Sequence, residues 1–267
     1  MSHRERVIAS GLAAIALCVL VTGGAATAKD GVTTKAPGAT AAASNTLTDV
    51  ERAEGWELLW DGRTTSGWRS AKGKEFPKDG WEIKDGVLSV VETGGAESRA
   101  GGDIVTDRVF EAFDLKVEFR LTPGANSGIK YYVDAELNKA EGSAIGLEFQ
   151  LLDDDTHPDA KAGRDGNRTI ASLYDLVPAG AGKKVRPMGE WNEARIVSAG
   201  RHVEHLLNGT KVLEYERGSE GFRKLVAESK YKVWPAFGEK PSGQILLQDH
   251  GNRVSFRNLK VRVLPGR

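Results

Sequence analysis

A carboxylate and a carboxamide stand two residues apart in an otherwise apolar stretch, AIGLEFQLLDDDTHPD (144–159). If this stretch begins as a β-strand, the alternation of side chains places Glu148 and Gln150 on one face. The opposite, core-facing set would be Leu147, Phe149 and Leu151. Burying a carboxylate without a partner is costly, so we expect the polar face to line a wet cleft. The ligand of this protein should lie across that cleft.

Polar side chains at alternating positions also mark four other runs of the chain. They are Glu118 and Arg120, Lys130 and Tyr132, His205, and Gln248 and His250. If these strands are neighbours in one sheet, a single groove contains carboxylates, amides, an ammonium group and imidazoles, which suits acid–base chemistry on a polyhydroxylated substrate. The alternative for Glu118 and Arg120 is a solvated face, which alternating charge usually indicates.

Glu148 and His250 are the candidate acid–base pair. His250 ends its run beside Gln248 and is followed by a glycine, so it can stand at the mouth of a groove. We expect Glu148, Gln248 and His250 to converge with Lys130 and Gln150. His205 is a third catalytic candidate, but a lone histidine on a strand is as readily a structural, hydrogen-bonded residue, and both interpretations stay open.

The acidic end of the stretch offers oxygen and nitrogen donors at close spacing. Asp153, Asp155 and His157 are the candidate metal ligands, and Ca²⁺ at the rim of a sandwich would use such a loop. The run lacks the fixed spacing of a known metal loop, and acidic loops are more often simply solvated. No cofactor is therefore certain, and Ca²⁺ is the candidate.

The elements that must position these residues are short apolar-alternating runs closed by Gly, Asp, Asn or Pro, which is the signature of an all-β protein. The expected strands cover 56–60, 81–91 as a hairpin about Asp85-Gly86, 102–106, 113–121, 127–134, 144–153, 191–216 as three antiparallel strands, and 242–251 with 253–264 as a last hairpin. Only 218–232 has helical spacing. A two-sheet jelly-roll sandwich with one short helix is the expected fold, and its concave exposed face would form the groove.

The N-terminal region has a different composition. Residues 1–28 combine a basic start, an apolar run and Ala26-Thr27-Ala28, which predicts a signal peptide cleaved near Ala28 and a periplasmic or secreted protein. Residues 29–50 have the composition of a disordered linker, and 51–265 should form one domain. The only cysteine, Cys18, lies in the signal, so we expect no disulfide.

Charge and motifs exclude several classes of function. Lys and Arg together number 37, and so do Asp and Glu, so nothing suggests a phosphate-tracking surface or a nucleic-acid partner. No stretch is long and apolar enough for a membrane span. No Ser-His-Asp spacing, phosphate-binding glycine loop or CxxC pattern is present. Four tryptophans lie early in the chain, and we expect their side chains in the core: Trp56, Trp60, Trp68 and Trp81.

Eight segments in register resemble the 3-keto-disaccharide hydrolase family. They are GWELLWDGRTTSGW (55–68), WEIKDGVL (81–88), GDIVT (102–106), FDLKVEFRL with NSGIKYYV (113–133), GLEFQLLDD (146–154), SLYDL (172–176), WNEARIVSAGRHVEHLLNG (191–209) and ILLQDHGNRVSFRNLKV (245–261). The resemblance implies a concanavalin-like jelly roll, related to laminin-G-like sandwiches, and a glycoside-cleaving hydrolase or lyase. Its substrates would be glycosides already oxidised at C3, cleaved by elimination across C1 and C2 before water is added.

A ketone at C3 acidifies the C2 proton, so such a reaction needs one base, one group that polarises the ketone and one acid for the leaving oxygen. Glu148 and His250 would supply the acid–base pair. The substrate-binding candidates are Lys130, Gln150, Tyr132, Arg120, Asp153, Tyr174 and Gln248. The chain departs from the family at Leu206 and Leu147, where relatives commonly have aromatic residues, which puts the choice of substrate in question more than the activity.

Two other classes of function compete with an enzyme. A non-catalytic, lectin-like sugar-binding module would use the same sandwich, because fold does not settle function. A structural or protein-binding domain would leave Glu148 and Gln150 unexplained.

Overall fold

The computed structural model describes residues 44–97, 99–134, 137, 143–234 and 236–266. These residues belong to one compact unit, Ala41–Arg267. The predicted signal peptide, and the predicted linker as far as residue 43, lie outside the described residues. Among the residues described, no helix is long and apolar enough to cross a membrane.

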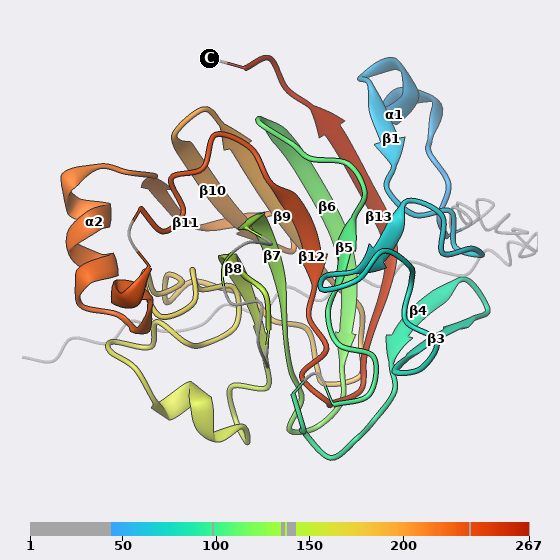
Figure 1. Cartoon of the computed structure of the whole chain (residues 1–267), viewed down its shortest axis with the longest axis horizontal. Coiled ribbons are helices and arrows are strands. Elements are labelled where there is room, and N and C mark those ends of the chain that lie inside the picture. The colour runs from blue at the N-terminus through green and yellow to red at the C-terminus, as the bar shows by residue number, and fades with distance from the viewer. Residues whose placement is uncertain (1–43, 98, 135–136, 138–142, 235, 267) are drawn as a thin grey trace, which may run out of the picture. The chain divides into compact units, whose positions relative to one another are not determined.

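The larger of two antiparallel sheets has eight strands, and it is one layer of a jelly-roll sandwich (Figure 1). Its strands are β1 (Trp56–Leu58), β3 (Trp81–Lys84), β4 (Val87–Val90), β6 (Phe113–Leu121), β9 (Asn192–Ala199), β10 (His202–Leu207), β11 (Thr210–Glu216) and β13 (Val254–Val263). Their order is β11-β10-β9-β6-β13-β4-β3, and β1 also pairs with β13. The hairpin at Asp85-Gly86 and the three strands within 191–216 are confirmed.

The smaller sheet has five strands and contains Lys130, Glu148 and Gln150. Its strands are β2 (Trp68–Ser70), β5 (Ile104–Thr106), β7 (Asn126–Asp134), β8 (Ile145–Leu152) and β12 (Gln244–Leu247), in the order β2-β5-β12-β7-β8. The predicted last hairpin is wrong, because β12 pairs with β5 and β7 while β13 lies in the other sheet. The side chains that β6, β10 and β13 expose to solvent therefore lie on a different sheet from Glu148.

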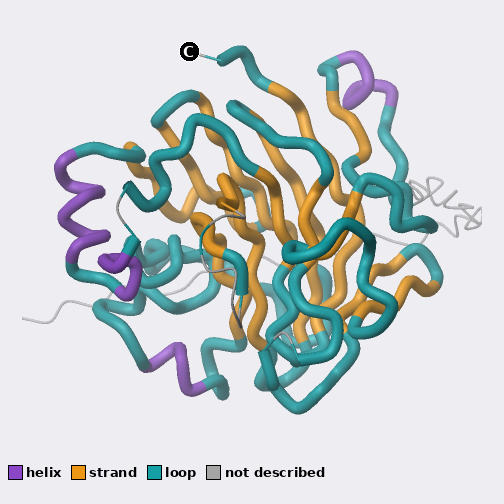
Figure 2. The backbone as a smooth tube through the Cα atoms, in the orientation of Figure 1, coloured by secondary structure: helices purple, strands orange, loops and turns teal. Residues whose placement is uncertain are grey.

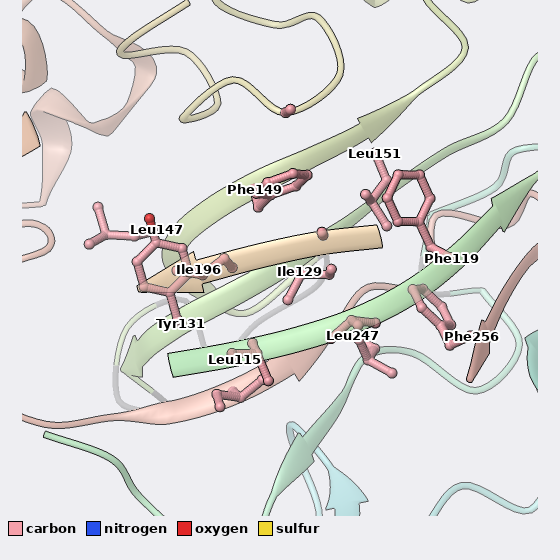
Figure 3. Packing of buried hydrophobic residues seen from close by; sticks show 14 of the residues in the cluster. Leu115, Phe119, Ile129, Tyr131, Leu147, Phe149, Leu151, Ile196, Leu247 and Phe256 are labelled. Carbon is pink, nitrogen blue, oxygen red and sulfur yellow. The ribbon is translucent and has the colours of Figure 1, made fainter. Parts of the chain in front are cut away.

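The core lies between the two sheets and follows the predicted alternation. Leu115 and Phe119 of β6 meet Ile129 of β7 and Phe149 of β8, and none of the four side chains is exposed (Figure 3). Burying each such side chain contributes about 1.5–3 kcal/mol. The tryptophans at 56, 60, 68 and 81 are also buried, as predicted. The all-β sandwich expected from the sequence is confirmed.

Helices occupy little of the described chain, as the tube view shows (Figure 2). The expected helix at 218–232 is shorter, because α2 spans Glu220–Ala227 and a separate 3₁₀ turn, η2, spans Lys230–Val233. A second 3₁₀ turn, η1, covers Pro158–Lys161. The α-helix α1 (Asp49–Ala53) was not expected, although Thr48 and Glu51 form a reciprocal capping box at its start.

The last part of the predicted linker belongs to the fold. Asn45 is buried and exchanges hydrogen bonds with Asn258 of β13: each backbone N–H donates to the other's side-chain Oδ1. The Asn45 amide also donates to the Gly86 carbonyl oxygen at 2.8 Å. The expectation of disorder as far as residue 50 is therefore wrong for residues 44–50, because specific side-chain bonds outweigh a weakly apolar composition.

Candidate active site

Glu148 and Gln150 lie on the outer face of β8, opposite the core-facing Phe149. The predicted assignment of faces is confirmed, but the expected wet cleft is wrong for these two side chains, which are 4% and 0% exposed. Residues 171–174 cover the free edge of β8, with Tyr174 N–H donating to the Glu148 carbonyl oxygen at 3.0 Å. The Glu148 carboxylate therefore stands in a sheltered place, where its interactions with charges are strong.

Gly128 provides the space that the Glu148 side chain occupies. β7 and β8 pair so that Lys130 faces Glu148 and Gly128 faces Gln150. A Cβ atom on Gly128 would lie 2.2 Å from Oε1 of Glu148 and 2.8 Å from its Cδ. The glycine therefore lets the carboxylate lie against the backbone of β7, a role that sequence analysis did not foresee.

Lys130 is the cation nearest to this carboxylate. Its Nζ lies 3.8 Å from Glu148 Oε2, which is beyond hydrogen-bond reach. Nζ donates to Ser143 Oγ and, at 3.1 Å, to the Ala144 carbonyl oxygen. An ammonium group has three N–H bonds, and no other described residue lies within hydrogen-bond reach of Nζ. The third N–H is left for the space beside Glu148.

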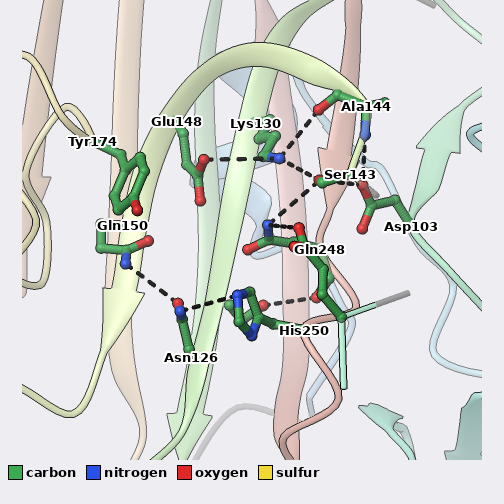
Figure 4. A network of polar contacts seen from close by, with 12 residues as sticks. Asp103, Asn126, Lys130, Ser143, Ala144, Glu148, Gln150, Tyr174, Gln248 and His250 are labelled. Carbon is green, nitrogen blue, oxygen red and sulfur yellow. Dashed lines mark hydrogen bonds and ion pairs between the residues drawn. The ribbon is translucent and has the colours of Figure 1, made fainter. Parts of the chain in front are cut away.

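Asp103 lies behind Lys130, immediately before β5. One of its oxygens, Oδ2, accepts from the Ser143 hydroxyl and from Ala144 N–H, and the other, Oδ1, accepts from Asp249 N–H at 3.0 Å. Figure 4 shows the chain of contacts that runs from Asp103 through Ser143 and Lys130 to Glu148. Sequence analysis missed Asp103 and Ser143; the only signal was an acid directly ahead of the apolar run IVT.

Burial shifts both carboxyl groups in the same direction. Desolvation raises the pKa of Glu148 above 4.5, and the charge of Lys130 opposes that rise. The pKa of Asp103 is raised for the same reason, again against the pull of Lys130. A glutamate with a raised pKa is a better match for proton transfer near neutral pH than an exposed one.

Gln150 and Asn126 connect Glu148 to His250. With its amide oriented to satisfy its neighbours, Gln150 donates to Glu148 Oε1 at 3.3 Å and to the Ser127 carbonyl oxygen at 3.0 Å. The Gln150 oxygen then faces the atom assigned as Asn126 Oδ1 at 3.3 Å, so the Asn126 amide must be turned as well, with its N–H₂ donating to Gln150. The Asn126 oxygen then lies 3.3 Å from His250 Nε2, whose N–H can donate to it. A hydrogen bond donated to a carboxylate oxygen favours the ionised form, so this Gln150 contact supports Glu148 as a base.

Two buried polar atoms on this face have no hydrogen-bond partner among the described residues, His250 Nδ1 and Gln248 Oε1. Gln248 Nε2, by contrast, is 3.4 Å from Ser143 Oγ and 3.3 Å from Glu97 Oε1. Buried polar groups in folded proteins are nearly always paired, so unpaired ones together mark a place for polar ligand groups. The predicted convergence of Glu148, Gln150, Lys130, Gln248 and His250 on one face agrees with this arrangement (Figure 4).

Tyr174 borders the same face. Its hydroxyl donates to Asp159 Oδ2 at 2.7 Å, and Lys230 Nζ lies 4.1 Å from the centroid of its ring. Arg168 holds Asp159 from the other side with an ion pair of 2.9 Å. The ring is therefore fixed beside Glu148 and Gln150 (Figure 4).

Two of the predicted site residues lie in the core instead. The His205 ring packs 4.7 Å from Phe149, centroid to centroid, and its nitrogens bond Tyr131 Oη and the Ala171 carbonyl oxygen. Tyr132, whose φ is 51°, stands where the β7–β8 register shifts, and its hydroxyl donates to the Glu111 carbonyl oxygen. The bulge turns Tyr132 inward, which alternation alone could not predict.

Arg120 is a third correction. It lies on β6 in the larger sheet, with its guanidinium 4.7 Å from the centroid of the Trp191 ring. Its neighbour Glu118 pairs with Arg257 at 2.7 Å. This is the solvated charged face that was the alternative interpretation, and it lies on a different sheet from Glu148.

The acidic loop after β8 is held by its own hydrogen bonds. Asp153 accepts from Gly124 N–H at 2.7 Å, from the Thr156 hydroxyl and from Asp155 N–H. Its carboxylate therefore stabilises the loop, and this argues against the predicted contact with substrate. His157 caps η1, with its Nδ1 accepting from Asp159 N–H.

Asp153, Asp155 and His157 do not meet at metal-binding distances in the described structure. The one such cluster among described residues is His202, Glu204 and Glu214, on an exposed hairpin where Lys211 already pairs with both glutamates. Ca²⁺ at the acidic loop stays a prediction without support from this geometry.

Comparisons with known proteins point to one family. Residues 55–262 match the model of the "3-keto-alpha-glucoside-1,2-lyase-like domain". A protein of Bacteroides thetaiotaomicron named 3-keto-disaccharide hydrolase is 38% identical over 232 residues, which cover 79% of each chain. A crystal structure of a candidate glycosyl hydrolase from Parabacteroides distasonis is 31% identical, with a TM-score of 0.71, over 83% of this chain and all of that one. A second such structure from the same organism is 28% identical, with a TM-score of 0.55, over 74% of this chain and 99% of that one.

Proposed function

Because the chain belongs to the family of 3-keto-alpha-glucoside-1,2-lyase-like domains, we propose that it cleaves the glycosidic bond of 3-keto-glucosides or 3-keto-disaccharides. One observation carries the proposal beyond the family: a sheltered carboxylate with a raised pKa, Glu148, beside the unused N–H of Lys130. A ketone oxygen that accepts from this N–H would bring the carbon next to the ketone carbon close to the Glu148 carboxylate.

In the proposed reaction Glu148 removes the C2 proton while Lys130 donates its third N–H to the C3 ketone oxygen. The negative charge that develops on that oxygen is stabilised by a donor that is already in place. The Lys130 ammonium is held by Ser143 and Ala144, so little reorganisation is needed when the charge appears. Glu148 ends this step protonated.

The leaving oxygen then departs with a proton from His250. The electron pair of the former C2–H bond forms a C1–C2 double bond as the C1–O bond breaks, and addition of water to that bond completes net hydrolysis. The partnerless Nδ1 of His250 is the atom that would carry the donated proton, while Nε2 is engaged by Asn126. Gln248 and Gln150 would bind the sugar hydroxyls from the same face.

We also propose that the protein acts outside the cytoplasm. The basic start, apolar run and Ala26-Thr27-Ala28 of residues 1–28 support export to the periplasm or the medium. Detection of the protein, shortened to a start near Lys29, in a periplasmic extract would agree with this proposal. Retention of the full-length chain in the cytoplasm would contradict it.

The activity is tested by incubating the purified protein with a 3-keto-disaccharide and, in parallel, with the same disaccharide before oxidation. We expect release of sugar from the oxidised form alone. In D₂O, deuterium should appear at C2 of the released keto-sugar, because a base has exchanged that proton. Stable binding of unoxidised oligosaccharides in a calorimeter, with no turnover of the keto form, would instead identify a lectin-like module.

A further inference from the structure

We propose that Asp103 and Ser143 are positioning residues that aim the Lys130 ammonium group at the reacting carbonyl oxygen. The role in catalysis rests on the proposed function, whereas the geometry stands independently of it. Asp103 is 5% exposed, and its hydrogen bonds join it to Ser143, Ala144 and Asp249 but not to Glu148, so it would act through other residues. A buried acid in this position needs a reason, because an isolated buried charge is costly.

The direction of each hydrogen bond follows from the chemistry of the groups. All contacts of the Asp103 oxygens are with donors: Ser143 Oγ–H, Ala144 N–H and Asp249 N–H. An ionised carboxylate can only accept, so the Ser143 proton goes to Asp103. The Ser143 oxygen is then left to accept from Lys130 Nζ.

Lys130 is thereby fixed by two acceptors that differ in kind. Ser143 Oγ is oriented by Asp103, and the Ala144 carbonyl oxygen belongs to a peptide whose N–H bonds the same carboxylate. Two of the three ammonium protons are held, so the third can point in only one direction, toward the side on which Glu148 Oε2 lies 3.8 Å away. Positioning a donor to within a fraction of an ångström is what a developing oxyanion requires.

Asp103 also joins this donor to the other half of the site. Its Oδ1 accepts from Asp249 N–H, and Asp249 lies between Gln248 and His250. One carboxylate therefore fixes the lysine on β7 and the segment that carries the proposed acid. This explains why a buried charge is present at the start of β5, where an apolar residue would otherwise be expected.

The test compares Ser143→Ala, which removes the hydroxyl, with Ser143→Thr, which restores one. Ser89→Ala is the matched control, because Ser89 is also buried and bonds Ser255 in the larger sheet. With a 3-keto-disaccharide we expect Ser143→Ala to lower kcat by up to about 100-fold with little change in KM. Ser143→Thr should recover most of this loss, and Ser89→Ala should behave like the unchanged protein.

A double substitution shows whether Ser143 acts through Lys130. In a Lys130→Met background, Ser143→Ala should lower kcat no further, because the group that it positions is gone. An equal loss in both backgrounds would overturn the proposal. If Asp103→Asn folds, its kcat should be lowered as much as that of Ser143→Ala. If it does not fold, the Ser143→Ala results alone test the positioning role.

A second readout does not depend on turnover. The ¹H–¹⁵N signal of the Lys130 ammonium group, identified by its absence in Lys130→Met, should be visible in the unchanged protein and in Ser143→Thr. It should be lost to exchange with water in Ser143→Ala. An unaltered signal in Ser143→Ala would overturn the positioning role. If the signal follows the expected pattern but no variant cleaves the keto-sugar, the proposed function fails and the positioning of Lys130 stands.

Discussion

At the scale of single residues, the protonation state of Glu148 should control the reaction. We expect Glu148→Gln to lower kcat by about 10²–10⁴-fold, because the amide cannot accept the C2 proton. Thermal unfolding should change little, since burial already disfavours the charged form. Unchanged turnover in this variant would assign the base to another residue.

The pH dependence has a defined sign. A base works when ionised, and burial raises the pKa of Glu148 above 4.5, so kcat/KM should rise with pH through a value above that of an exposed glutamate. Rates measured from pH 4 to 8 test this expectation. An acid limb centred at or below 4.5 would contradict it.

Gly128 offers a test of the carboxylate's exact location. Gly128→Ala places a Cβ atom 2.2 Å from Glu148 Oε1, so the carboxylate must move, and a loss of about 100-fold in kcat is expected. Gly182→Ala is the control, because a Cβ there meets nothing within 4 Å. In a Glu148→Gln background, Gly128→Ala should lower kcat by a far smaller factor. The same loss of about 100-fold in kcat in that background would show that Gly128 does not act through the Glu148 carboxylate.

Residue patterns predicted the proposed reacting groups better than the groups that would support them. Glu148, Gln150 and Lys130 were recognisable because a polar residue on an otherwise apolar strand is unusual. Asp103, Ser143 and Gly128 were not, because each has its role only through a neighbour that is distant in sequence or bonded across strands.

At the scale of elements, β10 places an imidazole in the core. Burial lowers the pKa of His205 from 6.5 to about 4, so the folded state favours the neutral ring. The stability that this provides is fully present above pH 6.5 and is lost as the pH falls toward 4. Between pH 7.5 and pH 5 the contribution of His205 to the free energy of unfolding should fall by about 2 kcal/mol.

Urea unfolding of the unchanged protein and of His205→Asn at both pH values isolates this contribution. The variant should be less stable at pH 7.5, and its stability should fall less between the two pH values. His202→Asn is the control on the same strand, where the side chain is 41% exposed and Glu216 raises the pKa of the histidine. Equal pH slopes for the unchanged protein and His205→Asn would contradict the prediction.

Strand positions were largely predictable, but their assignment to sheets was not. β6 and the strands within 191–216 appear where alternation and Asn-Gly turns placed them. Arg120 and His205 were wrongly assigned to the groove because β6 and β10 lie in the other sheet, which only pairing between distant segments determines. The prediction that Tyr132 contacts substrate was wrong for a local reason, because the bulge in β7 turns its side chain inward.

At the scale of the whole described domain, its first residues are fastened to its last strand. Asn45 has a φ of 57°, and it bonds Asn258 and Gly86. Asn45→Ala should lower the free energy of unfolding by about 2–3 kcal/mol, because it removes two hydrogen bonds and disfavours this backbone conformation.

Asn45→Gly separates the two causes, because glycine adopts the same φ without strain but makes neither side-chain bond. It should be less stable than the unchanged protein and more stable than Asn45→Ala in urea unfolding. An unaltered midpoint in Asn45→Ala would show that residues 44–48 do not contribute to the stability of the sandwich.

The place of β13 has a consequence for the time at which the protein can fold. β13 follows every other strand in sequence, yet it lies inside the larger sheet, between β6 and β4, and also pairs with β1. While the chain emerges from the ribosome, that sheet is split into pieces that cannot join until residues 254–263 have been made. Nascent chains that stop before Val254 should therefore remain open to protease. A polypeptide that stays unfolded until β13 has been made is one that a secretion channel can still thread.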